Sequence, residues 1–146
     1  MIKHLSKIKY HLFLLCMLIA FDQVTKFIAE GVFYKPIIQD YLAFHFIYNE
    51  NAPIFKVILG LLLVPVLFIM TYELEKEKCN LAYPIVIIAS GALSNTVEAL
   101  ICGKVADFIF VKPLGIIMNF ADLFLFLGTG LFLVKSVVFF FKNKST

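Results

Sequence analysis

The chain has 146 residues, of which 62% are hydrophobic and 17 are Phe. A soluble domain is about 45–50% apolar, so this composition, with a mean hydropathy of +0.95, excludes an ordinary soluble protein and indicates a polytopic membrane protein. The net charge is only +3, all 13 basic residues are Lys, and no basic patch with interleaved aromatic residues is present, which excludes nucleic acid as a partner.

Four apolar runs are each long enough, or nearly long enough, to cross a bilayer as a helix, which takes about 20 apolar residues. They cover residues 10–29, 56–72, 81–101 and 114–141. Pro65 and Pro84 lie within such runs, where membrane helices tolerate proline. The sequence therefore predicts an all-α integral membrane protein, with four transmembrane helices in one domain over residues 1–146.

The distribution of Lys predicts how the spans are oriented. With four spans, both termini and the link between the second and third spans lie on one side, which carries eight Lys against five on the other. The positive-inside rule then places both termini in the cytoplasm. Residues 30–55 and 102–113 become outer segments. Within the first of these, residues 35–48 alternate weakly in hydrophobicity, which predicts short strands or an amphipathic lid on the membrane surface.

Under this topology, polar residues from separate stretches gather at the outer face. They are Asp22 and Lys26 in the first span, Asn49 before the second, Asn95 and Glu98 late in the third, Asp107 after it, and Asn119 and Asp122 at the start of the fourth. Inserting an acid at the centre of a membrane helix costs roughly 2.5–3.5 kcal/mol of free energy, and less toward the interface. A chain that accepts such a cost twice on one side of the membrane is expected to need both acids for chemistry. Two acids that approach each other share a proton, so we expect Asp107 and Asp122 to form an aspartic protease dyad.

Structural interpretations exist for the residues of the first and third spans. Asp22 and Lys26 are four residues apart with the acid first, which favours a salt bridge within one helix. Asn95 and Glu98 are three residues apart on one helix face, where they could form hydrogen bonds between helices. The small residues around Gly91 would let another helix approach closely.

The residues of the proposed dyad have structural alternatives as well. Asn119 and Asp122 resemble a capping box, with Asn at the N-cap and an acid three residues later. An acid at that position also suits the helix dipole. Asp107 alone fits an ordinary turn residue. The combination, in a fixed order and in fixed local frames, favours the catalytic interpretation.

Four motifs in chain order are similar to those of the bacterial lipoprotein signal peptidases, the type II signal peptidases. Asp22-Gln23-Val24-Thr25-Lys26 looks like their D-x-x-[ST]-K stretch, and Ser90-Gly91-Ala92-Leu93-Ser94-Asn95 resembles their G-G-A-x-G-N segment. Val105-Ala106-Asp107-Phe108 resembles their V-x-D-F motif, and Asn119-Phe120-Ala121-Asp122 their N-x-A-D motif. The resemblance covers nearly the whole chain.

This resemblance implies a function and a site. Asp107 and Asp122 would be the catalytic pair, supported or helped in substrate binding by Asn49, Asn95, Glu98, Asn119, Asp22 and Lys26. The reaction would be the removal of signal peptides from diacylglyceryl-modified prolipoproteins, before the lipidated Cys. It would use no metal or organic cofactor, which agrees with scattered Cys and His residues that match no metal spacing.

The resemblance also implies a location and partners. The protein would be a multi-pass protein of the bacterial cytoplasmic (inner) membrane, with its active site near the outer face. Membrane lipid and prolipoprotein substrates would be its partners, and globomycin-type inhibitors would bind it. Residues 30–55 would form a small sheet-like cradle and a mobile lid.

The sequence departs from the family pattern at several positions. Glu98-Ala99 stands where the family has Asp-Arg, and Asn49-Glu50-Asn51-Ala52-Pro53-Ile54 replaces N-x-G-A-A-F. Ser90 and Ser94 replace two glycines. These changes alter the surroundings of the acids, so a catalytically altered paralogue that binds lipopeptide or lipid without cleavage stays open as an alternative.

Two further classes are less compatible with the sequence. A transporter or channel subunit usually carries its acids near the midplane, whereas these acids cluster at one face. A serine–lysine protease would use Thr25 with Lys26 or Ser136 with Lys135, but neighbouring residues on a helix do not face each other.

Overall fold

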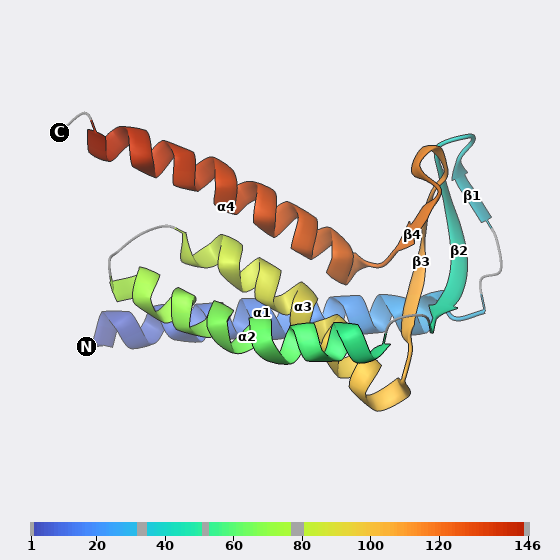
Figure 1. Cartoon of the computed structure of the whole chain (residues 1–146), viewed down its shortest axis with the longest axis horizontal. Coiled ribbons are helices and arrows are strands. Elements are labelled where there is room, and N and C mark those ends of the chain that lie inside the picture. Colours follow the sequence, from blue (N-terminus) through green and yellow to red (C-terminus); the bar gives the residue numbers. More distant parts are fainter. Residues whose placement is uncertain (1, 32–34, 51–52, 77–80, 145–146) are drawn as a thin grey trace.

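Within the described residues, three helices pack around a fourth, central helix, and together they form the body of the protein. The structure is a computed structural model and describes residues 2–31, 35–50, 53–76 and 81–144. The helices are α1 (Ile2–Ala29), α2 (Pro53–Lys76), α3 (Ala82–Cys102) and α4 (Phe120–Lys144). Helix α3 packs against each of the others (Figure 1), and more than half of its apolar stretch is buried, against 6% for α4.

The hydrophobic core lies between the first three helices. Leu15 of α1, Leu67 of α2 and Ile85 of α3 are buried against one another. Large apolar side chains such as Phe27 and Phe126 are each 78% exposed on the outside. This distribution reverses that of a soluble bundle and suits a hydrocarbon solvent.

A four-stranded antiparallel sheet lies at one end of the helices, opposite to the end where α1 begins and α4 finishes (Figure 1). Its strands, in spatial order, are β1 (Lys35–Ile38), β2 (Leu42–Asn49), β3 (Val105–Val111) and β4 (Ile116–Met118). Asp40, with φ of 68°, turns the chain between β1 and β2, and Gly115, with φ of 64°, turns it into β4. Gly suits such a left-handed position because it has no Cβ.

The apolar helices have the dimensions of membrane spans. Among the described residues, three stretches are long and apolar enough to cross a bilayer, namely Lys7–Ala29, Ala82–Cys102 and Phe120–Lys142. The apolar stretch Gly60–Leu74 of α2 is shorter. The structure therefore has the mainly helical, membrane-spanning character that the sequence predicts.

The sheet is larger than predicted and draws on both outer segments. The predicted all-α class placed strand-like structure only between the first two spans, but β3 and β4 belong to residues 105–118. The predicted fourth span starts at about residue 114, whereas α4 starts at Phe120. The apolar residues between these points pair with β3, for example Ile116 with Val111. A short apolar run adjoining a helix has no periodicity that separates it from the helix, so sequence alone merged the two.

Some predicted features lie outside the described residues. They include residues 51–52 of the segment that replaces the family's N-x-G-A-A-F, and residues 32–34 of the predicted lid.

Candidate active site

Asp107 is held on β3, at the end of the sheet that meets the helices. Its side chain is 2% exposed. Side chains alternate along a strand, so Asp107 faces away from Phe108. Asn49 pairs with Val105 on the neighbouring strand, and a diagonal cross-strand position brings its side chain toward Asp107. The Asn49 amide Nδ2 lies 3.4 Å from Asp107 Oδ2, which is a long contact.

Asp122 lies in the first turn of α4, where it forms a reciprocal capping box with Asn119. The Asp122 backbone N–H donates to Asn119 Oδ1 at 3.0 Å, and the Asn119 backbone N–H donates to Asp122 Oδ2 at 3.2 Å. The two contacts satisfy N–H groups that a helix start otherwise leaves without partners. The capping interpretation of this motif is therefore confirmed, and it fixes the Asp122 carboxylate in space.

Asn119 connects the two acids. Its side chain is fully buried, and its amide Nδ2 donates to Asp107 Oδ1 at 2.7 Å. The same nitrogen lies 3.2 Å from the Ala106 carbonyl oxygen. Because Asn119 also forms the capping box with Asp122, this one residue contacts the Asp107 carboxylate from a strand and the Asp122 carboxylate from a helix.

Asn95 of α3 contacts both Asp122 and Asn119 and links them to α1. Its Nδ2 donates to Asp122 Oδ1 at 2.9 Å. Its Oδ1 accepts from Asn119 Nδ2 at 3.1 Å and from Lys26 Nζ at 2.9 Å. Three different elements, α1, α3 and α4, therefore meet at one amide.

A buried charged cluster lies next to Asn95. Lys26 Nζ is 2.8 Å from Asp22 Oδ2 and 2.6 Å from Glu98 Oε2. The side chains are 4%, 0% and 9% exposed, respectively. Burying such charges away from water is unfavourable unless every donor and acceptor is paired. The Lys26 ammonium has three N–H donors, and they are paired with Asp22, Glu98 and Asn95. The predicted bridge within α1 is present, and it extends to α3.

Two polar residues of this cluster were not singled out from sequence. Ser94 Oγ donates to Asp22 Oδ2 at 2.7 Å, and Gln23 Nε2 donates to Ser94 Oγ at 2.9 Å. The available signal was the serine at a position where the resembling family has glycine. The sequence analysis noted this replacement but predicted no hydrogen bond for Ser94.

The outer rim of the site is a second, exposed cluster. The Tyr48 hydroxyl donates to Glu30 Oε1 at 2.7 Å, and Lys104 Nζ lies 3.4 Å from the centroid of the Tyr48 ring. The hydrogen bond to Glu30 raises the pKa of Tyr48 above its ordinary value of 10.0, because the carboxylate accepts from the neutral phenol and disfavours the phenolate. The cluster joins the end of α1 to the strand that carries Asn49.

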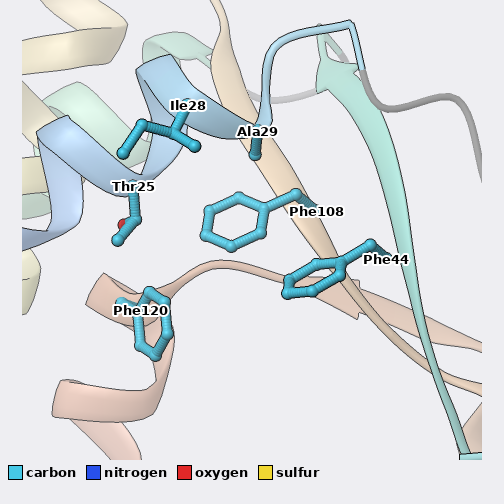
Figure 2. A pocket seen from close by; sticks show the side chains of 6 residues that line it. All are labelled: Thr25, Ile28, Ala29, Phe44, Phe108 and Phe120. Carbon is cyan, nitrogen blue, oxygen red and sulfur yellow. The ribbon is translucent and has the colours of Figure 1, made fainter. Parts of the chain in front are cut away.

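Two pockets with mainly apolar walls lie near the polar network. The first, of about 190 Å³, lies between α1, the sheet and the start of α4, with the centroids of the Phe108 and Phe120 rings 5.7 Å apart (Figure 2). That pocket is lined by Thr25, Ile28, Ala29, Phe44, Phe108 and Phe120. A second cavity of about 130 Å³ lies among α2, α3 and α4, and Asn95 and Asp122 reach its wall. The network thus contacts the second cavity directly through Asn95 and Asp122.

The eight predicted site residues all belong to one connected set of hydrogen bonds and ion pairs. Within the part of the chain that the structure describes, no group of three or more His, Cys, Asp or Glu residues is arranged to hold a metal ion. The geometry offers two carboxylates beside amide donors at a helix end. Such groups can hold a water and transfer its proton.

Comparisons with known proteins point to a single family. The sequence profile of the family described as "Signal peptidase (SPase) II" matches residues 14–138. Curated relatives named "Lipoprotein signal peptidase", from Desulfitobacterium hafniense strains DSM 10664 / DCB-2 and Y51, are 24% identical over 140 residues, covering 87% of this chain and 92% of theirs.

Two solved structures share the fold. Both are entitled "Bacterial membrane enzyme structure by the in meso method", one at 2.3 Å and one at 1.9 Å resolution. The first has a TM-score of 0.73 at 23% identity and covers 94% of this chain and 91% of its own. The second has a TM-score of 0.74 at 24% identity and covers 87% and 92%, respectively.

Proposed function

The chain belongs to the signal peptidase II family, and from that membership we propose that it is a membrane aspartic endopeptidase that removes signal peptides from lipoprotein precursors. Its substrate is a prolipoprotein whose Cys carries a diacylglyceryl group, and the cut lies directly before that Cys. The sequence match to curated relatives named lipoprotein signal peptidase covers 92% of their length, which supports this activity.

The observation that carries the aspartic mechanism is the contact of one buried residue with both acids. Asn119 donates its side-chain amide to Asp107 and its backbone N–H to Asp122. Two carboxylates brought together in this way, partly shielded from water, favour a state in which they share one proton. The proton belongs to the pair, so neither acid is assigned a fixed protonation state.

In the proposed reaction, the ionised acid of the pair takes a proton from a water molecule. The water oxygen attacks the scissile carbonyl carbon, and the protonated acid donates a hydrogen bond to the developing oxyanion. The C–N bond then breaks, and a proton passes from the pair to the leaving nitrogen. The products are a signal peptide with a new carboxylate and a lipoprotein with a free amino group on its lipidated Cys.

The remaining predicted residues have supporting roles in this proposal. Asn119 and Asn95 orient the two carboxylates through short amide contacts. Asn49 lies beside Asp107 on the neighbouring strand, with its Nδ2 3.4 Å from Asp107 Oδ2. Asp22, Lys26 and Glu98 lie behind these amides.

The cavity among α2, α3 and α4 is the proposed entry for the scissile segment. It is walled by Gly60 and Leu63 of α2, by Ala92 and Thr96 of α3 and by Leu125 of α4, with Asn95 and Asp122 as its polar groups. An apolar signal peptide would lie beside these helices in the bilayer. The acyl chains on the Cys would stay in the membrane, so enzyme and substrate would meet in two dimensions.

The proposed topology has four spans in a single domain, with both termini in the cytoplasm and the site near the outer face of the inner membrane. The Lys excess at the end of the molecule that holds both termini supports this orientation. In Figure 1 both ends of the chain lie at one end of the helices and the sheet lies at the other, as this topology requires.

Substitution of the two acids tests the mechanism. Asp107→Asn and Asp122→Asn should each lower cleavage of a lipidated precursor by about 10²- to 10⁴-fold, because each removes a proton donor or acceptor from the pair. Asp40→Asn is the matched control. It makes the same chemical change in the exposed turn between β1 and β2, where Asn tolerates a positive φ, and should leave cleavage unchanged.

The assay uses purified protein, a diacylglyceryl-modified precursor and gel separation of the products, with and without globomycin. Globomycin should block the cleavage. Normal processing by either acid variant would refute the dyad. If the wild-type protein binds the precursor without cutting it, and does not rescue a cell that lacks its own lipoprotein signal peptidase, the chain is the non-cleaving paralogue.

A further inference from the structure

Lys26 binds the carboxylates of Asp22 and Glu98. Each carboxylate also accepts a backbone N–H next to one of the proposed catalytic acids, and each such connection is called an arm. The first arm runs through Asp22. One oxygen of this carboxylate, Oδ2, binds Lys26 Nζ at 2.8 Å. The other, Oδ1, accepts the backbone N–H of Ala121 at 2.8 Å. Ala121 directly precedes Asp122, so the arm holds the peptide that carries one acid.

The second arm runs through Glu98. Its Oε2 binds Lys26 Nζ at 2.6 Å, and its Oε1 accepts the backbone N–H of Ala106 at 2.9 Å. Ala106 directly precedes Asp107, so this arm holds the peptide that carries the other acid. Each carboxylate divides its two oxygens in the same way, one to the ammonium and one to a backbone N–H.

The third donor of Lys26 fixes the direction of an amide. Asn95 Oδ1 accepts from Lys26 and from Asn119. An ammonium can only donate, so the oxygen of Asn95 must face Lys26. Its NH₂ group is thereby turned toward Asp122, to which it donates.

We propose that Lys26, acting through Asp22 and Glu98, is a positioning residue that sets the separation and orientation of the two catalytic acids. This inference rests on the proposed function. The physical reason is that the ammonium attracts both carboxylates, and each carboxylate pins one backbone segment. Without the ammonium, two buried negative charges repel each other, and the strand and the helix that carry the acids separate.

Glu98→Gln is the most direct test, because Gln has one acceptor oxygen where Glu has two. The variant keeps the size of the side chain but must give up either Lys26 or the Ala106 N–H. We expect kcat to fall by about 10- to 100-fold, as for a displacement of about 1 Å at a reacting centre. KM should change less than about twofold, because the cavity among α2, α3 and α4 is untouched. Glu98→Asp retains two acceptor oxygens, so its kcat should lie between those of Glu98→Gln and the wild type.

Asp40→Asn is the charge-matched control. It removes one negative charge from the exposed turn between β1 and β2, outside the network of the eight predicted site residues. Its kcat should stay within about twofold of the wild-type value. Thermal unfolding in detergent, measured for each variant, corrects kcat for the folded fraction.

A second readout does not depend on activity. In the wild type, the backbone N–H groups of Ala106 and Ala121 each donate to one carboxylate of the network, so their hydrogen exchange in detergent should be slow. In Glu98→Gln, exchange at Ala106 should become about tenfold faster, because its hydrogen bond to a carboxylate is lost or weakened. Exchange at Ala106 should change less in Glu98→Asp.

The outcomes separate the two proposals. A Glu98→Gln variant with wild-type kcat and wild-type hydrogen exchange at Ala106 would overturn the positioning role, and so would a loss of kcat that only follows a loss of folded protein. If the wild type cleaves no precursor, but exchange at Ala106 is slow in the wild type and faster in Glu98→Gln, the proposed function fails while the positioning role stands.

Discussion

Asp107 and Asp122 reach the same site from two different kinds of backbone. Asp107 lies in a strand, whose alternation turns its carboxylate away from the buried Phe108 ring. Asp122 lies in the first turn of a helix, where the capping box with Asn119 holds it. Neither carboxylate can turn without losing hydrogen bonds, so under the proposed mechanism the pair would be preorganised and little free energy would be needed to align it.

At the residue scale, the Tyr48 hydroxyl supplies a test of the outer rim. Its hydrogen bond to Glu30 raises its pKa, so Glu30→Gln should return that pKa toward the ordinary value of 10.0. Folding raises this pKa above the unfolded value, so the contact stabilises the protein below pH 10. Its contribution is lost as the pH rises through the folded pKa. Ultraviolet titration of tyrosinate, taken as the difference from Tyr48→Phe, measures the change.

This prediction has a simple contrary outcome. If the titration of Tyr48 is the same in Glu30→Gln and in the wild type, the hydrogen bond is absent in solution.

At the scale of elements, α4 depends on glycine contacts with α3. A Cβ on Gly91 of α3 would lie 2.3 Å from the Ala121 carbonyl oxygen, and one on Gly128 of α4 would lie 2.7 Å from the Ile88 side chain. Small residues of this kind let membrane helices approach closely. Because most of the α4 surface is exposed, these close approaches and the polar groups at its N-terminus determine where Asp122 lies.

Gly91→Ala should therefore displace the start of α4. The new methyl group meets backbone, which cannot rotate away, so we expect at least a tenfold loss of kcat, on the order of the penalty for a misplacement of about 1 Å. Gly130→Ala is the matched control on α4, where an added Cβ has nothing within 4 Å. It should retain activity and gain up to about 1 kcal/mol from helix propensity. Activity and thermal unfolding in detergent measure both variants, and equal activities would show that the contact does not position Asp122.

At the scale of the whole molecule, polar and apolar groups are sorted by position along the helices. The predicted site residues lie toward the end that carries the sheet, while the other end holds the start of α1 and the end of α4 (Figure 1). The helix surfaces between the two ends expose mainly apolar side chains. Under the proposed topology, this arrangement puts the candidate site at one membrane surface and an apolar belt against the hydrocarbon.

The orientation is testable by labelling single cysteines in a variant whose three native Cys are replaced by Ala. Gln39→Cys, in the exposed turn between β1 and β2, should react with a membrane-impermeant thiol reagent in intact spheroplasts. Lys142→Cys, near the end of α4, should react only after the membrane is broken. The opposite pattern would reverse the proposed topology, and labelling of both in intact cells would contradict the even number of spans.

The sequence by itself determined what depends on composition and on neighbours along the chain. Hydropathy located the apolar helices, because a span needs a long apolar run whatever its partners are. The capping box of Asn119 and Asp122 was visible in four residues, since its contacts are local. The four motifs in order pointed to the family that the profile match now shows.

Only the tertiary structure decided which distant groups meet. The Asp22 carboxylate accepts from a backbone N–H 99 residues away, and no local pattern encodes that contact. Likewise, Ile116 and its neighbours became a strand and not the start of a helix, because β3 offered an edge to pair with. Such contacts depend on how α1, α3 and the sheet pack in three dimensions. The free energy of that packing depends on residues far apart in the chain, so no short stretch of sequence determines it.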